Sequence, residues 1–272
     1  QAADALGATK LHRPEWVSVD EKTKDVYLTL TNGTGNGAPV NSDRDPNPYG
    51  HVLKIRERKR DNTELTFRWE VFVLAGDPAY DPAVPTDQPV FGSPDGIWVD
   101  PVSRVWIETD ISNSSQNLAS RGYDNIGNNQ VLVADPASGE IKRFLTGPRG
   151  CEMTGIVMTP DMRTLFVNVQ HPGESTSFWN SQFGAPSVTN PTAVSSWPFG
   201  GRPRPADLVE EGIDELVVDR ALQQQPREPA LLRRRDRMVV DQVGEPVEVG
   251  AGGAGVSARV VEYGPVALAA AD

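Results

Sequence analysis

Five carboxylates stand at matched positions in three similar segments of the chain, and their placement points to metal chemistry. Glu15 and Asp95 occupy the same place in the first two segments, and Glu152 lies two residues before that place in the third. Glu108 and Asp110 stand near the end of the second segment. Carboxylates that face one cavity repel each other unless cations lie among them, and oxygen ligands suit hard ions such as Ca²⁺, Mg²⁺, Mn²⁺ or Fe³⁺. We therefore predict that these residues bind metal: Glu15, Asp95, Glu108, Asp110 and Glu152.

Other acids are better explained by local structure. Each of four aspartates lies in a turn beside Pro, Gly or Lys, where a short carboxylate caps backbone N–H groups. We interpret these four as turn formers: Asp20, Asp100, Asp135 and Asp161. The same explanation stays open for the five matched acids, as strand caps or, for Glu108 and Asp110, as solvated acids of an edge strand.

Three basic residues stand close to the acids and could act on an anion. His171 follows a predicted strand end, although a hydrogen-bonded structural role fits it equally. Arg149 and Arg13 each precede an acidic position, and guanidinium binds phosphate through two parallel hydrogen bonds. Arg149 stands closer to its carboxylate in the run Arg149-Gly150-Cys151-Glu152, so we rank it above Arg13; either could instead be a counter-ion. Cys151 is better read as a buried side chain than as a nucleophile.

The elements that carry these residues repeat. Each segment reads as a short strand, a polar turn and a second apolar strand, over 13–32, 93–110 and 152–171. Polar residues alternate near the end of each second strand and so share one face. These pairs are Thr29 and Thr31, Glu108 and Asp110, and Asn168 and Gln170.

Two further strand pairs lie between the repeats, at 49–74 and 129–145, around polar turns. Four antiparallel strands make a propeller blade, and long polar inserts separate the strands at 33–48, 75–92, 111–127 and 172–205. We therefore predict an all-β fold, a partial β-propeller of about two to three blades, over residues 1–206. An incomplete ring needs its missing part, so we expect residues 1–272 alone not to be a competent enzyme.

The tail from 207 to 272 differs in composition. It has one aromatic residue, Tyr263, and is rich in Glu, Arg, Val, Gly and Ala. We expect no further blade strand there, a weakly ordered or frameshift-derived segment, and at most a helix over 208–222. A small appended α/β module is the alternative.

Composition narrows the function classes. The chain has 272 residues, 25 Gly, 23 Pro and a net charge of −11, with a pI near 4.8. Nucleic-acid binding needs a basic surface, so an acidic chain argues against it and fits a cation-binding protein. One cysteine allows no internal disulfide, and no apolar run is long enough to span a membrane. The chain starts at Gln1 without a visible signal peptide, so we expect a processed or truncated piece.

Several strings together resemble the PhoX family of alkaline phosphatases, over roughly residues 5–206. They are Arg13-Pro14-Glu15-Trp16-Val17, Leu30-Thr31-Asn32, Ser93-Pro94-Asp95-Gly96, Cys151-Glu152-Met153-Thr154-Gly155 and Asn168 to Glu174, with Trp197-Pro198 to Arg204-Pro205 resembling the approach to the last strand. The residues after Pro205 depart from the family's closing strand.

The resemblance implies a six-bladed propeller that binds iron and calcium ions and hydrolyses phosphomonoesters. It implies twin-arginine export, hence a periplasmic or secreted protein. It supports the five acids as metal ligands and adds candidates near the phosphate: Arg149, His171 and Asn32. On this hypothesis the metals neutralise phosphate oxygens and Arg149 offsets developing charge.

Two other functions remain open on the residues alone. A calcium-dependent propeller lactonase, or sugar-lactone hydrolase, also uses Pro-Asp-Gly strand starts and acids in its channel. A non-catalytic propeller scaffold is the second alternative. Irregular spacing, with 80 residues from Glu15 to Asp95 and 59 from Asp95 to Thr154, disfavours the scaffold.

Overall fold

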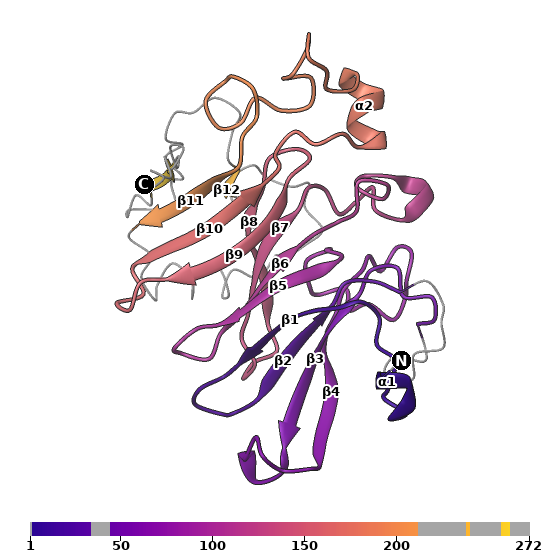
Figure 1. Cartoon of the computed structure of the whole chain (residues 1–272), viewed down its shortest axis with the longest axis vertical. Helices are drawn as coiled ribbons and strands as arrows, with labels where there is room; N and C mark the ends of the chain where they lie inside the picture. The colour runs from indigo at the N-terminus through magenta and orange to yellow at the C-terminus, as the bar shows by residue number, and fades with distance from the viewer. Residues whose placement is uncertain (1, 34–43, 212–237, 240–256, 262–272) are drawn as a thin grey trace, which may run out of the picture.

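The computed structural model describes residues 2–33, 44–211, 238–239 and 257–261. Within these residues almost all regular structure is antiparallel β-sheet, in three sheets that follow one another along the chain (Figure 1). The all-β prediction is confirmed.

The first sheet is a four-stranded meander in the order β1-β2-β3-β4. Its strands are β1 (Pro14–Val19), β2 (Val26–Leu30), β3 (His51–Glu57) and β4 (Phe67–Leu74). The second sheet has the order β5-β6-β7-β8, with β12 parallel to β8 at its edge. Its strands are β5 (Pro94–Val99), β6 (Val105–Thr109), β7 (Gln130–Ala134), β8 (Ile141–Thr146) and β12 (Met238–Val239).

The third sheet has the order β9-β10-β11-β13. Its strands are β9 (Glu152–Met158), β10 (Thr164–Gln170), β11 (Ala206–Glu211) and β13 (Ser257–Val261). Between β10 and β11 the chain forms α2 (Ser177–Phe183), which lies at the top of Figure 1. The other helices are α1 (Ala2–Ala5) and the 3-10 turns η2 (Arg58–Arg60) and η3 (Ala119–Arg121). All ten strands predicted from alternation are present, and no described helix is both long and apolar enough to cross a membrane.

Two large apolar clusters lie between successive sheets. One joins the first sheet to the second and includes Tyr27, Val52 and Ile107. The other joins the second to the third and includes Trp106 and Val167. Alternating side chains allow the middle sheet to bury both its faces, and the sheets therefore stack through their faces.

The first strand of each sheet has a register irregularity near the end that carries an acid. In β1 it lies between Pro14 and Val17, in β5 between Pro94 and Ile97, and in β9 near Gly155, whose φ is +69°. A bulge bends a strand and redirects the side chains beside it. The repeat thus extends to a shared distortion at the three strand starts.

The tail contributes strands that the sequence analysis did not expect. β11 begins at Ala206, crosses the expected boundary at 206/207, and pairs with β10 from Thr164 to Val169. Leu208 is fully buried in the core, and β13 pairs with β11. The expectation of no strand after 206 is wrong for 207–211, 238–239 and 257–261, as is a helix starting at Leu208. Residues 212–222 lie outside the described part.

The four aspartates interpreted as turn formers do accept backbone hydrogen bonds. Asp20 Oδ1 accepts from Lys22 N at 2.8 Å, and Asp135 Oδ1 from Ala137 N at 2.8 Å. Asp161 accepts from Arg163 N at 3.1 Å, and Asp100 from the N of Val102 at 3.0 Å. Their side chains stabilise the tight turns and are not available to the acidic cluster.

Candidate metal centre

Three of the five predicted ligands converge. Asp95 is the second residue of β5, Asp110 follows β6, and Glu152 opens β9, so the group joins the second and third sheets. One carboxylate oxygen from each lies within 4.8 Å of those of the other two. A cation of the size of Ca²⁺ takes oxygen ligands at about 2.3–2.6 Å, so oxygens this close together suit one shared ion.

Two of the three carboxylates, Asp95 and Asp110, are held in an environment that disfavours their negative charge. Burial raises the pKa of Asp95 to about 7, with further contributions from the charges of Glu15, Asp110 and Glu152. Burial raises the pKa of Asp110 to about 6, and the charge of Glu152 adds to the shift. A bound cation would offset both causes, because it replaces lost hydration and screens the repulsion.

Glu15 and Arg13 lie at the edge of this group. Arg13 Nη2 is 3.2 Å from Glu15 Oε1, and both side chains are partly exposed. The positive charge of Arg13 opposes the upward pKa shifts of Asp95 and Asp110. Arg13 has φ +42°, and Ser93, at the matched position before the proline that opens β5, has φ +57°. Non-glycine residues in the left-handed region carry backbone strain, and such residues are often found at functional sites.

Glu108 lies behind the group rather than in it. It is fully buried, and its Oε2 accepts a hydrogen bond from Ile156 N at 3.3 Å. A Cβ at Gly96 would overlap that same oxygen, so Gly96 lets the carboxylate pass between β5 and β9. Burial raises the pKa of Glu108 to about 8. Its Oε1 has no hydrogen-bond partner within the described residues, so its role as a metal ligand stays a prediction.

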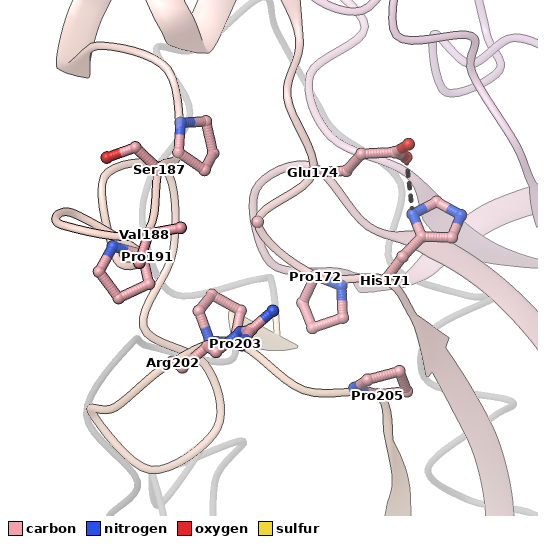
Figure 2. A pocket seen from close by; sticks show the side chains of 11 residues that line it. His171, Pro172, Glu174, Ser187, Val188, Pro191, Arg202, Pro203 and Pro205 are labelled. Atoms are coloured by element: carbon pink, nitrogen blue, oxygen red, sulfur yellow. Dashed lines mark ion pairs between the residues drawn. The ribbon is translucent and has the colours of Figure 1, made fainter.

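His171 contacts the group through Glu152. Its Nε2 lies 3.3 Å from Glu152 Oε2, and its Nδ1 lies 2.9 Å from Glu174 Oε2, an ion pair drawn in Figure 2. Gln170 Nε2 also donates to Glu152. The hydrogen bond with Glu152 raises the pKa of His171, and the Glu174 charge adds to it. His171 therefore stands between two carboxylates that favour its charged form.

A sequence profile described as "Alkaline phosphatase PhoX" matches residues 1–173. The chain belongs to the PhoX alkaline phosphatase family. It is similar to a solved structure, "Pseudomonas fluorescens PhoX in complex with vanadate, a transition state analogue", with 39% sequence identity and a TM-score of 0.62. That similarity covers 76% of this chain and 35% of the Pseudomonas chain, so the chain spans about a third of its length. No curated protein matches.

The donor set agrees with the metal dependence of the PhoX family. The three converging ligands offer only oxygen atoms, and the pKa values of Asp95 and Asp110 are raised by burial and by neighbouring carboxylates. Hard cations prefer such ligands.

Arg149 and Asn32 have their described contacts outside the group of converging carboxylates. The Arg149 guanidinium lies 4.5 Å from the centroid of the Phe183 ring and 5.2 Å from that of Trp179, both on α2. Asn32 is half-buried just beyond β2, next to Thr31, whose N donates to Arg13 O at 3.1 Å. Their roles near phosphate stay predictions. Arg13 is among the charges that act on Asp95 and Asp110, and it stands before Pro14 as Ser93 stands before Pro94.

Proposed function

We propose that the chain carries part of the catalytic site of a metal-dependent phosphomonoester hydrolase of the PhoX type. The observation that carries the proposal is the convergence of Asp95, Asp110 and Glu152 beside Arg13. Metal ligands next to a guanidinium are what a phosphate dianion requires, because both neutralise its oxygens. Membership of the PhoX family supports the same conclusion.

The metals in this proposal are iron and calcium. Asp95, Asp110 and Glu152 would hold a shared ion, and Glu15, at the edge of the group, and Glu108, behind it, would complete the set. When bound, such ions act as Lewis acids on phosphoryl oxygens. Calcium takes many oxygen ligands in flexible geometry, which suits carboxylates that come from different strands.

The chain's own residues would bind and orient the ester. Arg13 offers its guanidinium to a phosphate oxygen, and Arg149 is a second candidate held by the α2 rings. His171, which lies between Glu152 and Glu174, would hold a proton at Nε2 or Nδ1 for the leaving oxygen. Asn32 would donate its amide. Glu108 positions β9 by accepting from its backbone.

The architecture belongs to the proposal as well. We infer that the three stacked sheets are blades of a six-bladed propeller and that the missing half completes the ring. One face of the first sheet supports this: Val17 is 58% exposed on β1, and Phe67 and Trp69 are 56% and 48% exposed on β4. Cross-strand register places these residues on one side of the sheet with Leu28, Leu53 and Ile55. By family, the protein is exported, to the periplasm or the medium, by the twin-arginine route.

Hydrolysis of p-nitrophenyl phosphate by the metal-loaded, full-length protein tests the activity. The proposal predicts turnover that a chelator removes, with iron and calcium both found by elemental analysis. Calcium alone, with lactone hydrolysis and no phosphate release, would replace the phosphatase by the lactonase. Metal-free protein with neither activity would leave only the binding scaffold.

A further inference from the structure

A cavity of about 550 Å³ opens next to the candidate site, and its lining includes His171, which contacts Glu152. The turn from His171 to Glu174 forms one wall, and loops around Ser187 and Pro203 form the others (Figure 2). Ligand sites for small molecules commonly have volumes of about 300–1,000 Å³. The cavity is thus large enough for the organic part of a small ester.

The wall shared with the metal group is fixed in place. Gly173 N donates to Arg149 O at 2.8 Å, and Glu174 N donates to Gly150 O at 3.1 Å. A Cβ at Gly173, whose φ is +79°, would lie 2.7 Å from Pro203 Cγ, so the opposite loop packs directly on the turn. These contacts hold the cavity against the segment that leads into Glu152.

Most of the lining is apolar and its prolines are stiff, while His171, Glu174, Ser187 and Arg202 add polar groups. Five of the eleven lining residues are prolines, which offer ring C–H surface and no backbone donor, and Val188 adds methyl groups that are almost fully exposed. Proline fixes φ near −65°, so the walls lose little conformational freedom when a ligand binds. Arg202 is an exposed cation among them. Guanidinium stacks on aromatic rings, whereas the prolines give a polyol nothing to bond to.

We propose that this cavity receives the alcohol part of the phosphomonoester and that it favours flat, aromatic leaving groups over small polyhydroxylated ones. The inference rests on the proposed phosphatase function. With the phosphate held by the metal group and Arg13, an ester substituent that passes His171 enters the cavity. Val188 and the prolines then pack on its faces, and Arg202 stacks on it.

The test compares p-nitrophenyl phosphate with glycerol 2-phosphate in the full-length, metal-loaded protein. Val188→Glu should lower kcat/KM for the aryl ester about tenfold and leave glycerol 2-phosphate within about twofold, because a charge then stands in the apolar cavity. Val188→Lys should lower the aryl-to-glycerol ratio in the same direction, although its charge has the opposite sign. Leu65→Glu, at an equally exposed apolar residue in the β3–β4 turn, is the matched control and should change neither value.

A binding measurement separates stacking from charge. Arg202→Ala should weaken phenylphosphonate binding about two- to fivefold and leave methylphosphonate unchanged, and Arg202→Lys should restore only part of the loss. An unchanged substrate ratio in both Val188 variants, or equal losses for both esters, would overturn the subsite while leaving the phosphatase intact. A wild-type protein that hydrolyses neither ester would overturn the proposed function, and the subsite with it.

Discussion

At the residue scale, the centre of the account is a set of carboxylates whose charges the folded chain disfavours. Asp95 has its pKa raised to about 7 and Asp110 to about 6, chiefly by burial. A carboxyl group whose folded pKa exceeds its ordinary value of 3.8 stabilises the fold below that value, and the stabilisation is lost as pH rises through the folded pKa. The metal-free protein should therefore weaken between about pH 4 and pH 7.

Replacing Asp95 by Asn should remove part of that pH dependence, while Asp110 and Glu108, whose pKa values are also raised, retain the rest. At pH 8 the metal-free Asp95→Asn protein should be more stable than wild type by about 2–4 kcal/mol, and the difference should vanish near pH 4. Denaturant unfolding at several pH values measures it. Asp161→Asn, in an exposed turn, is the control and should give no gain at pH 8. A wild-type free energy of unfolding that does not fall over this range would contradict the carboxylate cluster.

The two arginines can be ranked by kinetics. Arg13 influences Asp95 and Asp110, whereas Arg149 is stacked on Phe183 and Trp179. Arg13→Ala should lower kcat/KM for p-nitrophenyl phosphate about a hundredfold, the usual cost of one preorganised donor to a developing charge.

Arg149→Ala should lower kcat/KM for p-nitrophenyl phosphate less than Arg13→Ala does. Thermal melting of both variants controls for folding. The reverse order would restore the ranking that sequence reasoning favoured. It would also show that the α2 rings hold the principal phosphate-binding group.

At the element scale, the site depends on how closely β5 and β9 approach. Glu108 passes over Gly96 and accepts from the backbone of β9, so it links the two strands that carry Asp95 and Glu152. Gly96→Ala would put a methyl group into Glu108 Oε2. We expect a loss of about 1–3 kcal/mol of stability, seen as a lower Tm, together with weaker metal binding.

Gly201→Ala provides the matched control for that substitution. Nothing lies within 4 Å of a Cβ at Gly201, so the change should be nearly neutral. A Gly96→Ala protein as stable as the Gly201→Ala protein would mean that β5 and β9 are not locked together by Glu108.

The elements were predictable from the sequence where alternation is strong. β5 and β6 are rich in apolar residues, which point alternately to the two buried faces of the second sheet. The sequence predicted both strands with small errors at their ends. β11 was missed because its sequence, Ala206 to Glu211, contains only two large apolar residues between acids, and pairing with β10 decides its conformation. Tertiary contacts override such weak local preference.

The site was predictable in part for a similar reason. Matched strand starts indicated that Asp95 and Glu152, which lies two residues before the matched position, would be near each other, and the structure brings them together with Asp110. The surroundings of Arg149 could not be foreseen, because the rings that stack on it lie on a helix about 30 residues away. Sequence spacing indicates which residues share an element. It does not show which distant residue a side chain contacts in the folded protein.

At the scale of the whole molecule, the first sheet has an apolar face that is partly exposed. Val17, Val19, Phe67 and Trp69 are exposed on it, and single-domain proteins rarely leave such a face open. Residues 1–272 alone should therefore self-associate, with a weight-average mass that rises with concentration in analytical ultracentrifugation. Substituting Val17→Thr and Trp69→Lys together should reduce the association.

The opposite result would contradict the prediction that residues 1–272 self-associate. If residues 1–272 stay monomeric, unfold cooperatively and hydrolyse phosphomonoesters, the missing half of the ring is unnecessary and the propeller proposal fails. Leu65→Lys, exposed in a turn away from the face, should leave the association unchanged.

The most direct test of the account is the metal content and phosphatase activity of Glu152→Gln in the full-length protein. Glu152 joins Asp95 and Asp110 in the cluster and orients His171, and the amide keeps its shape while removing its charge. The account predicts that metal content and p-nitrophenyl phosphate hydrolysis fall together, hydrolysis by at least about a hundredfold. Unchanged metal and activity in Glu152→Gln would contradict it.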